Sequence, residues 1–499
     1  MKKSLIKYRL FIFFLCLGIS GIAQKNIFLS RNYWKNNPSL DQVKNDIAQG
    51  NNPTELDSNA FDSVTWALIE KVNNETIKFL LEYKENGVNK LTHDGRTYIF
   101  WAAYKDNLEM LQYLVDNGAK TNIIDHHGYS ILNFAAVTGQ QNHMLYDFLI
   151  SHGADITETN RNGANPLLLV SPFLKDDKLI NYFTNKGIDF NSKDDDGNGI
   201  FNYAVKKGNI QVLDLLIKKG ADYKTPSKNG SNAFIFASQG TRGSSNKLLT
   251  YKYLENLGLQ PNITTDDGFT PLHALAYNNK DINIFKYFIE KGVDINQSDM
   301  NGNTAFLNAA HKNNIEIITF LSNYVNDINE INKNGQTALM GAVETNTLEV
   351  INFLINKKSN ISIKDNDNNT LVYYLIESYD EKDPNIFNKK LKKLLNKGLK
   401  INKNQSKGQT LWHLAVKKNN LQLLEQISSF NNFLNQKNEE GLTPIHLAAM
   451  KATDTEILKF LMEKGADITI KTDYDESVFD LAYENELLQK QNKNLNFLK

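Results

Sequence analysis

The sequence has little cysteine, little proline and no excess of either charge. One cysteine in 499 residues excludes a disulfide framework and a zinc site built from several thiolates of one chain. Nine prolines exclude long polyproline linkers. The 56 basic residues balance the 56 acidic residues, which argues against a dedicated nucleic-acid-binding protein. After the first 23 residues, no apolar run approaches the ~18 residues typical of a membrane-spanning helix.

The first 23 residues have the pattern of a secretory signal peptide. The apolar run of residues 10–19 follows a basic stretch that contains Lys2, Lys3, Lys7 and Arg9. A small-x-small site at residues 21–23 predicts cleavage before Gln24. We therefore expect residues 1–23 to be a signal peptide and the protein to be exported, periplasmic or secreted. Two alternatives stay open: an uncleaved signal anchor, and a lipoprotein attached through Cys16.

Removal of this leader would change the composition of the chain. The remaining chain would have 52 basic and 56 acidic residues and no cysteine. An exported protein without disulfides must be held together by packing alone. A bacterial periplasm or secretion setting fits such a chain better than a eukaryotic one.

A phrase of glycine, one residue, threonine or a substitute, a short apolar run and alanine recurs along the chain. Its starting residues are mostly 33 or 34 apart: Gly95, Gly128, Gly163, Gly197, Gly230, Gly268, Gly302, Gly335, Asn368, Gly408 and Gly441. Each phrase precedes a second apolar pattern at helical spacing that often ends at glycine, the preferred residue just past a helix end. Threonine caps helices and proline suits their first position. One unit therefore reads as turn, short helix, longer helix and glycine stop.

These units resemble the ankyrin repeat. The residues that carry the resemblance are TPLH at 270–273, TLWHLA at 410–415, TPIHLAA at 443–449 and the Gly-Ala-Asp triplets at 153, 220 and 465. The resemblance covers eleven units in phase from about residue 93 to 473. It implies an all-α solenoid of stacked helix-turn-helix units with hairpin-like turns.

The predicted organisation has four parts. Residues 1–23 form the signal peptide, residues 24–92 an N-terminal cap with an irregular first repeat, residues 93–473 the repeat array, and residues 474–499 a C-terminal capping helix and tail. The length therefore counts repeats in one stack, not three separate domains. Two insertions, at 240–247 and 379–385, are expected between the two helices of their repeats.

No catalytic signature is present. The loop at 240–247 lacks the Gly-Lys-Ser/Thr ending of a phosphate loop, and neither H-E-x-x-H nor G-x-S-x-G occurs. The resemblance implies that His273, His413 and His446 are structural and hydrogen-bond the turn joining successive repeats. The basic stretch 389–393 is interpreted as a solvated helix face, with an acidic partner or a phospholipid surface as the alternative. We expect no enzyme activity, no cofactor and no metal site.

The resemblance implies a protein-binding scaffold that uses its turn tips and the concave side of its short helices. Transferred by position, the expected contact residues are His93, Arg96, Tyr104, Lys105, His126, His127, Tyr129, Phe269, Tyr277 and His311. Trp101 and Trp412 are expected in the core. The partner is expected to be a protein of unknown identity. The chain is expected to be a monomer without an integral membrane segment after leader removal. Two alternatives remain: an accessory or inhibitor module for an exported enzyme, and a hydrolase with an unrecognised site.

Overall fold

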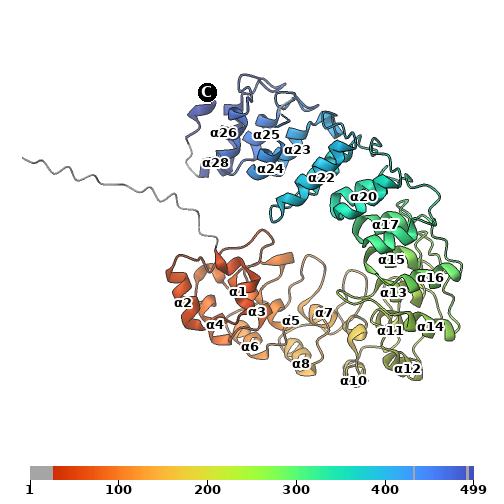
Figure 1. The fold of residues 1–499 in the computed structure, drawn as a ribbon. Coiled ribbons are helices and arrows are strands. Elements are labelled where there is room, and N and C mark those ends of the chain that lie inside the picture. Colours follow the sequence, from red (N-terminus) through yellow and green to blue (C-terminus); the bar gives the residue numbers. More distant parts are fainter. Residues whose placement is uncertain (1–25, 431–432, 491–493) are drawn as a thin grey trace, which may run out of the picture. The chain divides into compact units, whose positions relative to one another are not determined.

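The protein is described by a computed structural model that covers residues 26–430, 433–490 and 494–499 (Figure 1). The expected signal peptide, residues 1–23, lies outside these residues. The chain divides into two compact units, residues 1–190 and 191–499, and each is described by itself. In the described part the regular elements are all helices, as the sequence predicts, beside three isolated β-bridges. No helix in that part has the length and apolar character that crossing a bilayer requires.

Among its described residues, the first unit contains two N-terminal α-helices and four helix pairs, which follow one another along the chain (Figure 1). The N-terminal helices are α1 (Arg31–Lys35) and α2 (Leu40–Ala48). The pairs are α3 (Ser63–Glu70) with α4 (Asn74–Leu81), α5 (Tyr98–Tyr104) with α6 (Leu108–Asp116), α7 (Ile131–Val137) with α8 (His143–Ser151), and α9 (Pro166–Val170) with α10 (Lys178–Asn185). The first helices of successive pairs, α3, α5, α7 and α9, pack on one another.

The described part of the second unit contains nine helix pairs. They are α11 (Ile200–Ala204) with α12 (Ile210–Lys218), α13 (Ala233–Gln239) with α14 (Leu248–Asn256), α15 (Pro271–Asn278) with α16 (Ile282–Glu290), α17 (Ala305–Lys312) with α18 (Ile315–Leu321), α19 (Ala338–Thr345) with α20 (Leu348–Asn356), α21 (Leu371–Glu377) with α22 (Pro384–Asn396), α23 (Leu411–Lys417) with α24 (Leu421–Ile427), α25 (Pro444–Lys451) with α26 (Glu456–Glu463), and α27 (Val478–Glu484) with α28 (Glu486–Lys490). The first helices again stack in chain order.

The two helices of a pair differ in how much surface they bury. In α5, six of seven residues are buried, among them Trp101, so the helix is apolar nearly all round. In α6 the buried residues are Met110, Leu111 and Leu114, which form one stripe, and the opposite face is polar. The first helices therefore form the continuous core of each unit and the second helices cover it. Trp412 is also fully buried, so the core position expected for both tryptophans is confirmed.

Seven of the turn tips between pairs are built by one Asp or Asn side chain. Oδ1 of Asp125 accepts the backbone N–H groups of His127 and Tyr129, both at 2.9 Å. The same pair of hydrogen bonds, from the backbone N–H groups of the second and fourth following residues, recurs at Asn160, Asp194, Asp299, Asn332, Asp365 and Asn438. The third following residue has positive φ, which favours glycine; Asn368 takes this conformation, at φ 66°, where the phrase lacks its glycine.

Threonine and histidine join the start of a first helix to the next tip. Nδ1 of His413 accepts the backbone N–H of Thr410 at 3.1 Å, so the proton must be on Nε2, which donates to the carbonyl of Leu442 at 2.8 Å. His273 and His446 make the same two contacts, to the carbonyls of Asn303 and Ile470. The structural role implied for these three histidines is confirmed.

Asparagines form a second joint at the other end of the first helices. The amide of Asn313 donates to the carbonyls of Ala276 and Asn279 in the preceding repeat. The amide of Asn346 does the same to Ala310 and Asn313. Both asparagines are buried, and the carbonyls at a helix C-terminus have no partner within the helix. These two repeats therefore satisfy the helix ends of their predecessors.

In the ninth repeat a lysine, and not an asparagine, donates to the helix end of the preceding repeat. Val343 occupies the position of Ala310 one repeat later, and its carbonyl accepts a hydrogen bond from Nζ of Lys390 at 2.7 Å. Lys390 lies on α22, is 3 % exposed, and burial lowers its pKa to about 8. The interpretation of stretch 389–393 as a solvated face is therefore wrong at Lys390, although Lys389 and Lys392 are exposed. The insertion before α22 explains the exchange, because it replaces the loop that carries the asparagine elsewhere.

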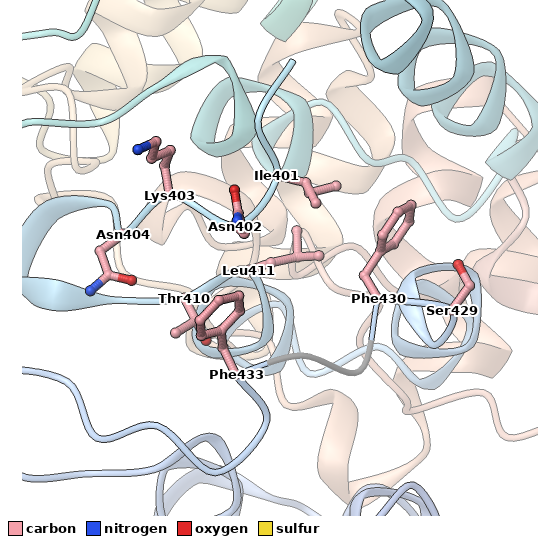
Figure 2. Close-up of a pocket in the computed structure, with 9 residues that line it drawn as sticks. All are labelled: Ile401, Asn402, Lys403, Asn404, Thr410, Leu411, Ser429, Phe430 and Phe433. Atoms are coloured by element: carbon pink, nitrogen blue, oxygen red, sulfur yellow. The ribbon is translucent and has the colours of Figure 1, made fainter. Parts of the chain in front are cut away.

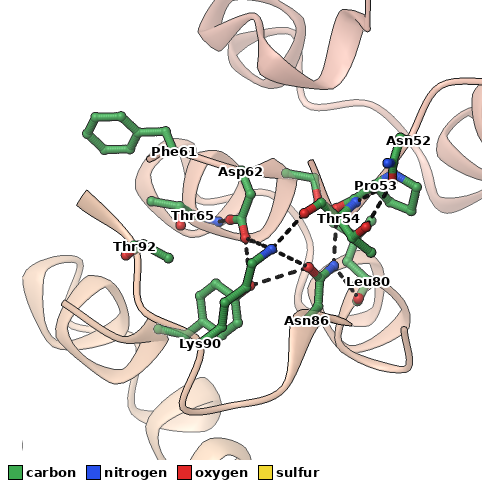
Figure 3. Close-up of polar contacts among 12 residues, drawn as sticks. Asn52, Pro53, Thr54, Phe61, Asp62, Thr65, Leu80, Asn86, Lys90 and Thr92 are labelled. Atoms are coloured by element: carbon green, nitrogen blue, oxygen red, sulfur yellow. Dashed lines mark hydrogen bonds and ion pairs between the residues drawn. The ribbon is translucent and has the colours of Figure 1, made fainter. Parts of the chain in front are cut away.

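A buried polar network ties the irregular first repeat to its neighbour (Figure 3). The carboxylate of Asp62 accepts Nζ of Lys90 at 2.8 Å, the hydroxyl of Tyr98 at 2.7 Å and the N–H of Thr65 at 2.9 Å. Nζ of Lys90 also donates to Oδ1 of Asn86 and to the Thr54 carbonyl, and the Asn86 amide donates to the carbonyls of Pro53 and Leu80. Burial, then the charge of Asp62, raises the pKa of Tyr98, which keeps it a neutral donor.

The structural histidines predict how stability depends on pH. Burial lowers the pKa of His413 to about 4 and also lowers those of His273 and His446. The unfolded chain binds these protons near pH 6.5, so between about pH 6.5 and 4 it binds more protons than the folded chain. The free energy of unfolding must therefore fall as the pH is lowered through this window. We expect the urea midpoint of the native chain, measured by circular dichroism, to fall as the pH is lowered. The difference in urea midpoint between the native chain and His413→Gln should become smaller, because the variant has no imidazole at this position.

The matched control is His126→Gln, at an exposed histidine of a turn tip. Its urea midpoint at neutral pH is expected to equal that of the native chain, because the ring of His126 forms none of the three buried histidine joints. A gap for His413→Gln that stays constant or widens on acidification would contradict the assigned hydrogen bonds.

Candidate functional site

The ten expected contact residues fall into three groups. Five lie at the first two clear turn tips, His93, Arg96, His126, His127 and Tyr129, and two end α5, Tyr104 and Lys105. These seven belong to the first unit. Phe269, Tyr277 and His311 belong to the second unit.

The carboxylate of Asp94 is the centre of the tip cluster. Its Oδ2 lies 3.2 Å from Nε2 of His93, 3.2 Å from Nε2 of His127 and 3.0 Å from Nη1 of Arg96. The three partners come from two successive tips. Burial alone would raise the pKa of Asp94, but the charges of His93 and Arg96 and the hydrogen bond from His127 outweigh it and lower the pKa. The carboxylate therefore joins the two tips.

The close approach of the two tips depends on a glycine. The N–H of His126 donates to the carbonyl of Asp94 at 2.9 Å. The ring of His126 lies over Gly95, where a Cβ would be 2.4 Å from its Nε2, and Gly95 has φ 70°. Both His126 and His127 are exposed to solvent. These two histidines are therefore placed on the surface, as the sequence predicts for tip residues.

Arg96 lies inside the tip cluster and is 8 % exposed. Its Nε and Nη2 donate to Oδ2 of Asp125 at 2.8 and 2.7 Å, and its guanidinium lies over the ring of Phe134, 4.3 Å from the centroid. A guanidinium group stacked on an aromatic ring in this way makes a favourable cation–π interaction. The structure therefore places Arg96 as a clamp between repeats, and the clamp residues Asp125 and Phe134 come from the next repeat.

Tyr104 and Lys105 lie at the opposite end of α5 from the tips. Both are half-buried, and Nζ of Lys105 lies 4.8 Å from the centroid of the Tyr104 ring. The Tyr104 ring also contacts Trp101 and Phe134, at 6.4 and 6.1 Å between centroids. Tyr104 therefore continues an aromatic surface that starts in the core.

The second unit places its three residues along consecutive repeats. The Phe269 ring stacks on His273 at 5.2 Å, so it covers the joint between repeats. Tyr277 is 40 % exposed at the end of α15. His311 occupies the equivalent position on α17, and its Nδ1 lies 3.0 Å from Oγ1 of Thr345. The structure thus brings Tyr277 and His311 onto one face of neighbouring first helices.

Sequence reasoning missed an aromatic column in the irregular first repeat. The Phe61 ring stacks between Trp66, at 4.3 Å, and His93, at 4.4 Å. The guanidinium of Arg31 lies 5.5 Å from the centroid of Trp66. Trp66 and Phe61 are both half-buried. The aromatic residues are visible in the sequence. Because this segment lacks the repeat phrase, the sequence does not show that Phe61 and Trp66 lie next to His93.

Two hollows stand out among the described residues. One cavity of about 90 Å³ lies in the second unit, and Figure 2 shows its lining residues, Ile401, Asn402, Lys403, Asn404, Thr410, Leu411, Ser429, Phe430 and Phe433. This cavity is smaller than the ~300 Å³ that ligand pockets usually enclose. An open, polar cleft of about 500 Å³ lies in the first unit and is lined by residues 71–75 and 105–109. Among the described residues, no three His, Cys, Asp or Glu side chains are placed to hold a metal ion. The surfaces that remain are those of the tips and of the first helices.

The clamp role of Arg96 predicts a stability effect. Arg96→Gln leaves Asp125 buried without its cationic partner, which should lower the free energy of unfolding by about 3 kcal/mol. Urea unfolding followed by tryptophan fluorescence measures this loss. The control is Arg161→Gln, an exposed arginine of the following tip, which should change stability by about 0.5 kcal/mol at most. Equal small losses for both variants would contradict the clamp.

Family models match most of the chain. The model described as ankyrin repeats (3 copies) matches residues 64–160, 242–330, 272–367, 314–388 and 384–472, and the model described as ankyrin repeats (many copies) matches residues 174–217. These ranges contain the Thr–His joints and the asparagine joints of the second unit.

Several known proteins are similar to parts of the chain. The ankyrin repeat protein L371 of Acanthamoeba polyphaga mimivirus is 25 % identical, over 48 % of this chain and 31 % of its own length. The transient receptor potential cation channel subfamily A member 1 of Homo sapiens is 23 % identical, over 86 % of this chain and 35 % of its own. The chain thus spans about a third of the length of these curated relatives.

A solved structure is also similar to one stretch. A chain in the complex of the predatory endopeptidase Bd0816 from Bdellovibrio bacteriovorus with the immunity protein Bd3460 matches with a TM-score of 0.32 and 23 % identity, over 38 % of this chain and 98 % of that chain. The matching family models, together with the paired helices and their repeated joints, lead to one conclusion: this chain belongs to the ankyrin repeat family.

Proposed function

We propose that the chain is a non-catalytic protein-binding scaffold, exported from a bacterial cell, that recognises its partner through turn tips and the exposed ends of its first helices. The support comes from a comparison of the repeats with one another. The threonine at the start of the first helix recurs in six repeats, whereas the exposed residues seven positions later differ. A surface with such variation on a constant frame suits specific recognition of another protein.

Six successive repeats of the second unit carry this observation. Each starts its first helix after the same residue type: Thr270, Thr304, Thr337, Thr370, Thr410 and Thr443. Seven residues later the type changes almost every time: Tyr277, His311, Glu344, Glu377, Lys417 and Met450. All six of these side chains are exposed or half-buried. We call this set the variable row.

The variable row provides several kinds of interaction. Tyr277 and Met450 expose apolar surface, at 40 % and 47 %, and aromatic and methionine side chains are frequent in protein interfaces. Glu344 and Lys417 add charges of opposite sign. Because the first helices pack tightly on one another, the row is presented with little loss of backbone entropy on binding.

A capture experiment tests the row. The native chain and the variant Tyr277→Ala/His311→Ala/Met450→Ala are immobilised, and proteins bound from an envelope extract are quantified by mass spectrometry. We expect the specific partner to be captured at least tenfold less by the variant, a loss of about 1.4 kcal/mol or more.

The control variant is Leu249→Ala/Tyr324→Ala/Ile386→Ala, which truncates three exposed apolar side chains outside the row. It should retain the partner. If the control variant loses the partner and the row variant retains it, the binding site does not lie on the variable row.

Export has its own test. Residues 1–23 combine a basic start, an apolar segment and a small-x-small site, and these features support the proposal of a cleaved signal peptide. The full chain is produced in a Gram-negative host, and the exported protein is sequenced from its N-terminus. We expect it to start at Gln24, and Phe14→Arg, which interrupts the apolar segment, to keep the full-length protein inside the cell. Full-length protein that stays inside without that change would contradict export.

A further inference from the structure

The helix α22 differs in charge from the other second helices of its unit. It carries four lysines and no Asp or Glu, whereas every other second helix in the described part of the second unit carries at least one acidic residue. The difference extends past the end of the helix, because residues 384–424 contain ten lysines, no arginine and no acidic residue. The 56 basic and 56 acidic residues of the whole chain balance, so this excess is local.

Six lysines gather at the C-terminal ends of α22 and of its neighbour α20. Two of them follow α20, and four lie in the second half of α22 or follow it. The helices α20 and α22 pack side by side. All six side chains are exposed except that of Lys393, which is half-buried. We call this set the lysine face: Lys357, Lys358, Lys392, Lys393, Lys397 and Lys400.

The lysine face lacks the ion pairs that join other second helices. Lys291, which directly follows α16, pairs with Glu255 of the preceding second helix, α14. Lys397 directly follows α22 in the same way, but the residue at the position of Glu255 in α20 is Ile355. Within the described part of the chain, no side chain of the lysine face forms an ion pair. The fold therefore does not use these charges for pairing.

The surrounding acidic residues do not neutralise the lysine face. Four of them lie at the opposite ends of the two helices: Glu349, Asp380, Glu381 and Asp383. At a rise of ~1.5 Å per residue they are ~12 Å or more from the face lysines of their own helix, farther than the Debye length of ~8 Å at physiological salt. Three others lie one repeat away, where helix layers are ~10 Å apart: Asp327, Glu330 and Glu425.

One residue of the lysine face occupies a position where glycine is the usual residue. The helices α16 and α22 are followed by Gly292 and Gly398, with φ 85° and 93°. The equivalent residue after α20 is Lys358, which takes the same left-handed conformation at φ 68°. A residue with a Cβ is strained in this conformation, so the fold alone favours glycine. The fold therefore gives no reason for a lysine at this position.

The chemistry of the lysine face distinguishes between kinds of anionic partner. The cores of protein interfaces are depleted in lysine and enriched in arginine and aromatic residues. Single-stranded nucleic acids stack their bases on aromatic rings, and the adjacent ring of Phe353 is already covered by Nζ of Lys357, 5.6 Å from its centroid. An anionic bilayer requires neither feature, because mobile headgroups adapt to flexible point charges. Clusters of about four to eight lysines on an amphipathic helix are typical of binding to anionic lipid.

We propose that the lysine face binds the surface of a bilayer that contains anionic phospholipids. The ammonium groups lie against the lipid phosphates, and the half-buried side chains of Ile355 and Leu395 contact the headgroup layer. The variable row lies on first helices, so this contact does not use it. The proposal goes beyond the proposed protein-binding function and does not depend on it.

Co-sedimentation with vesicles tests the proposal with the full chain. We expect vesicles of equal amounts of phosphatidylglycerol and phosphatidylcholine to bind the native chain at least tenfold more tightly than vesicles of phosphatidylcholine alone. The affinity for the anionic vesicles should fall at least tenfold for Lys392→Gln/Lys393→Gln/Lys397→Gln/Lys400→Gln. For the native chain it should also fall at least tenfold as salt rises from 50 to 300 mM, because the interacting charges are exposed. All variants retain residues 1–23, so any binding by this segment is common to them.

The matched control is a variant that removes four exposed lysines on or beside other second helices of the same unit, Lys218→Gln/Lys252→Gln/Lys280→Gln/Lys286→Gln. It changes the net charge by the same amount and should bind the anionic vesicles within threefold of the native chain. The urea midpoints of both quadruple variants should equal that of the native chain, which excludes unfolding as the cause of a difference in binding.

The possible failures are distinguishable. Equal affinity of the native chain and the lysine-face variant for anionic vesicles overturns the proposal, as does equal affinity of the native chain for both kinds of vesicle. Binding of oligo-dT or polyglutamate that depends on the lysine face overturns the assignment to lipid if, at the same concentration of negative charge, it is as tight as binding to the vesicles. The lysine-face variant should still capture the partner of the variable row, so failure of either proposal leaves the other in place.

Discussion

A single repeat of this chain leaves its own polar backbone unsatisfied, and the missing partners come from the neighbouring repeat. Nε2 of His413 donates to the Leu442 carbonyl of the next tip, and the Asn346 amide donates to two carbonyls of the preceding helix end. Buried polar groups without partners cost ~1–3 kcal/mol each. Stacking is therefore required by hydrogen bonding as well as by apolar burial, and stability becomes a property of neighbouring pairs.

Lys390 shows that the carbonyl at a helix end has a donor even where the usual asparagine is absent. The insertion before α22 removes the usual asparagine, yet the Val343 carbonyl is still satisfied, now by an amine from the second helix. The exchange has a cost, because burial lowers the pKa of Lys390 to about 8. A buried lysine is retained where a helix end would otherwise have no donor.

The sequence predicts the repeated part of this architecture because the relevant contacts are local or recur at a fixed period. The Thr–His joint is readable, since Thr410 and His413 are three residues apart and the third partner lies one period away. Arg96 is different. Its burial depends on Asp125 and Phe134, whose side chains converge on it only when two tips stack. Lys390 and the Phe61–Trp66 column lie in segments that leave the period, so register could not be inferred there.

The joints also decide where function can reside. The threonine that starts the first helix is the same in six repeats of the second unit, at Thr270 and its equivalents, whereas the variable row changes from tyrosine to histidine, glutamate, lysine and methionine.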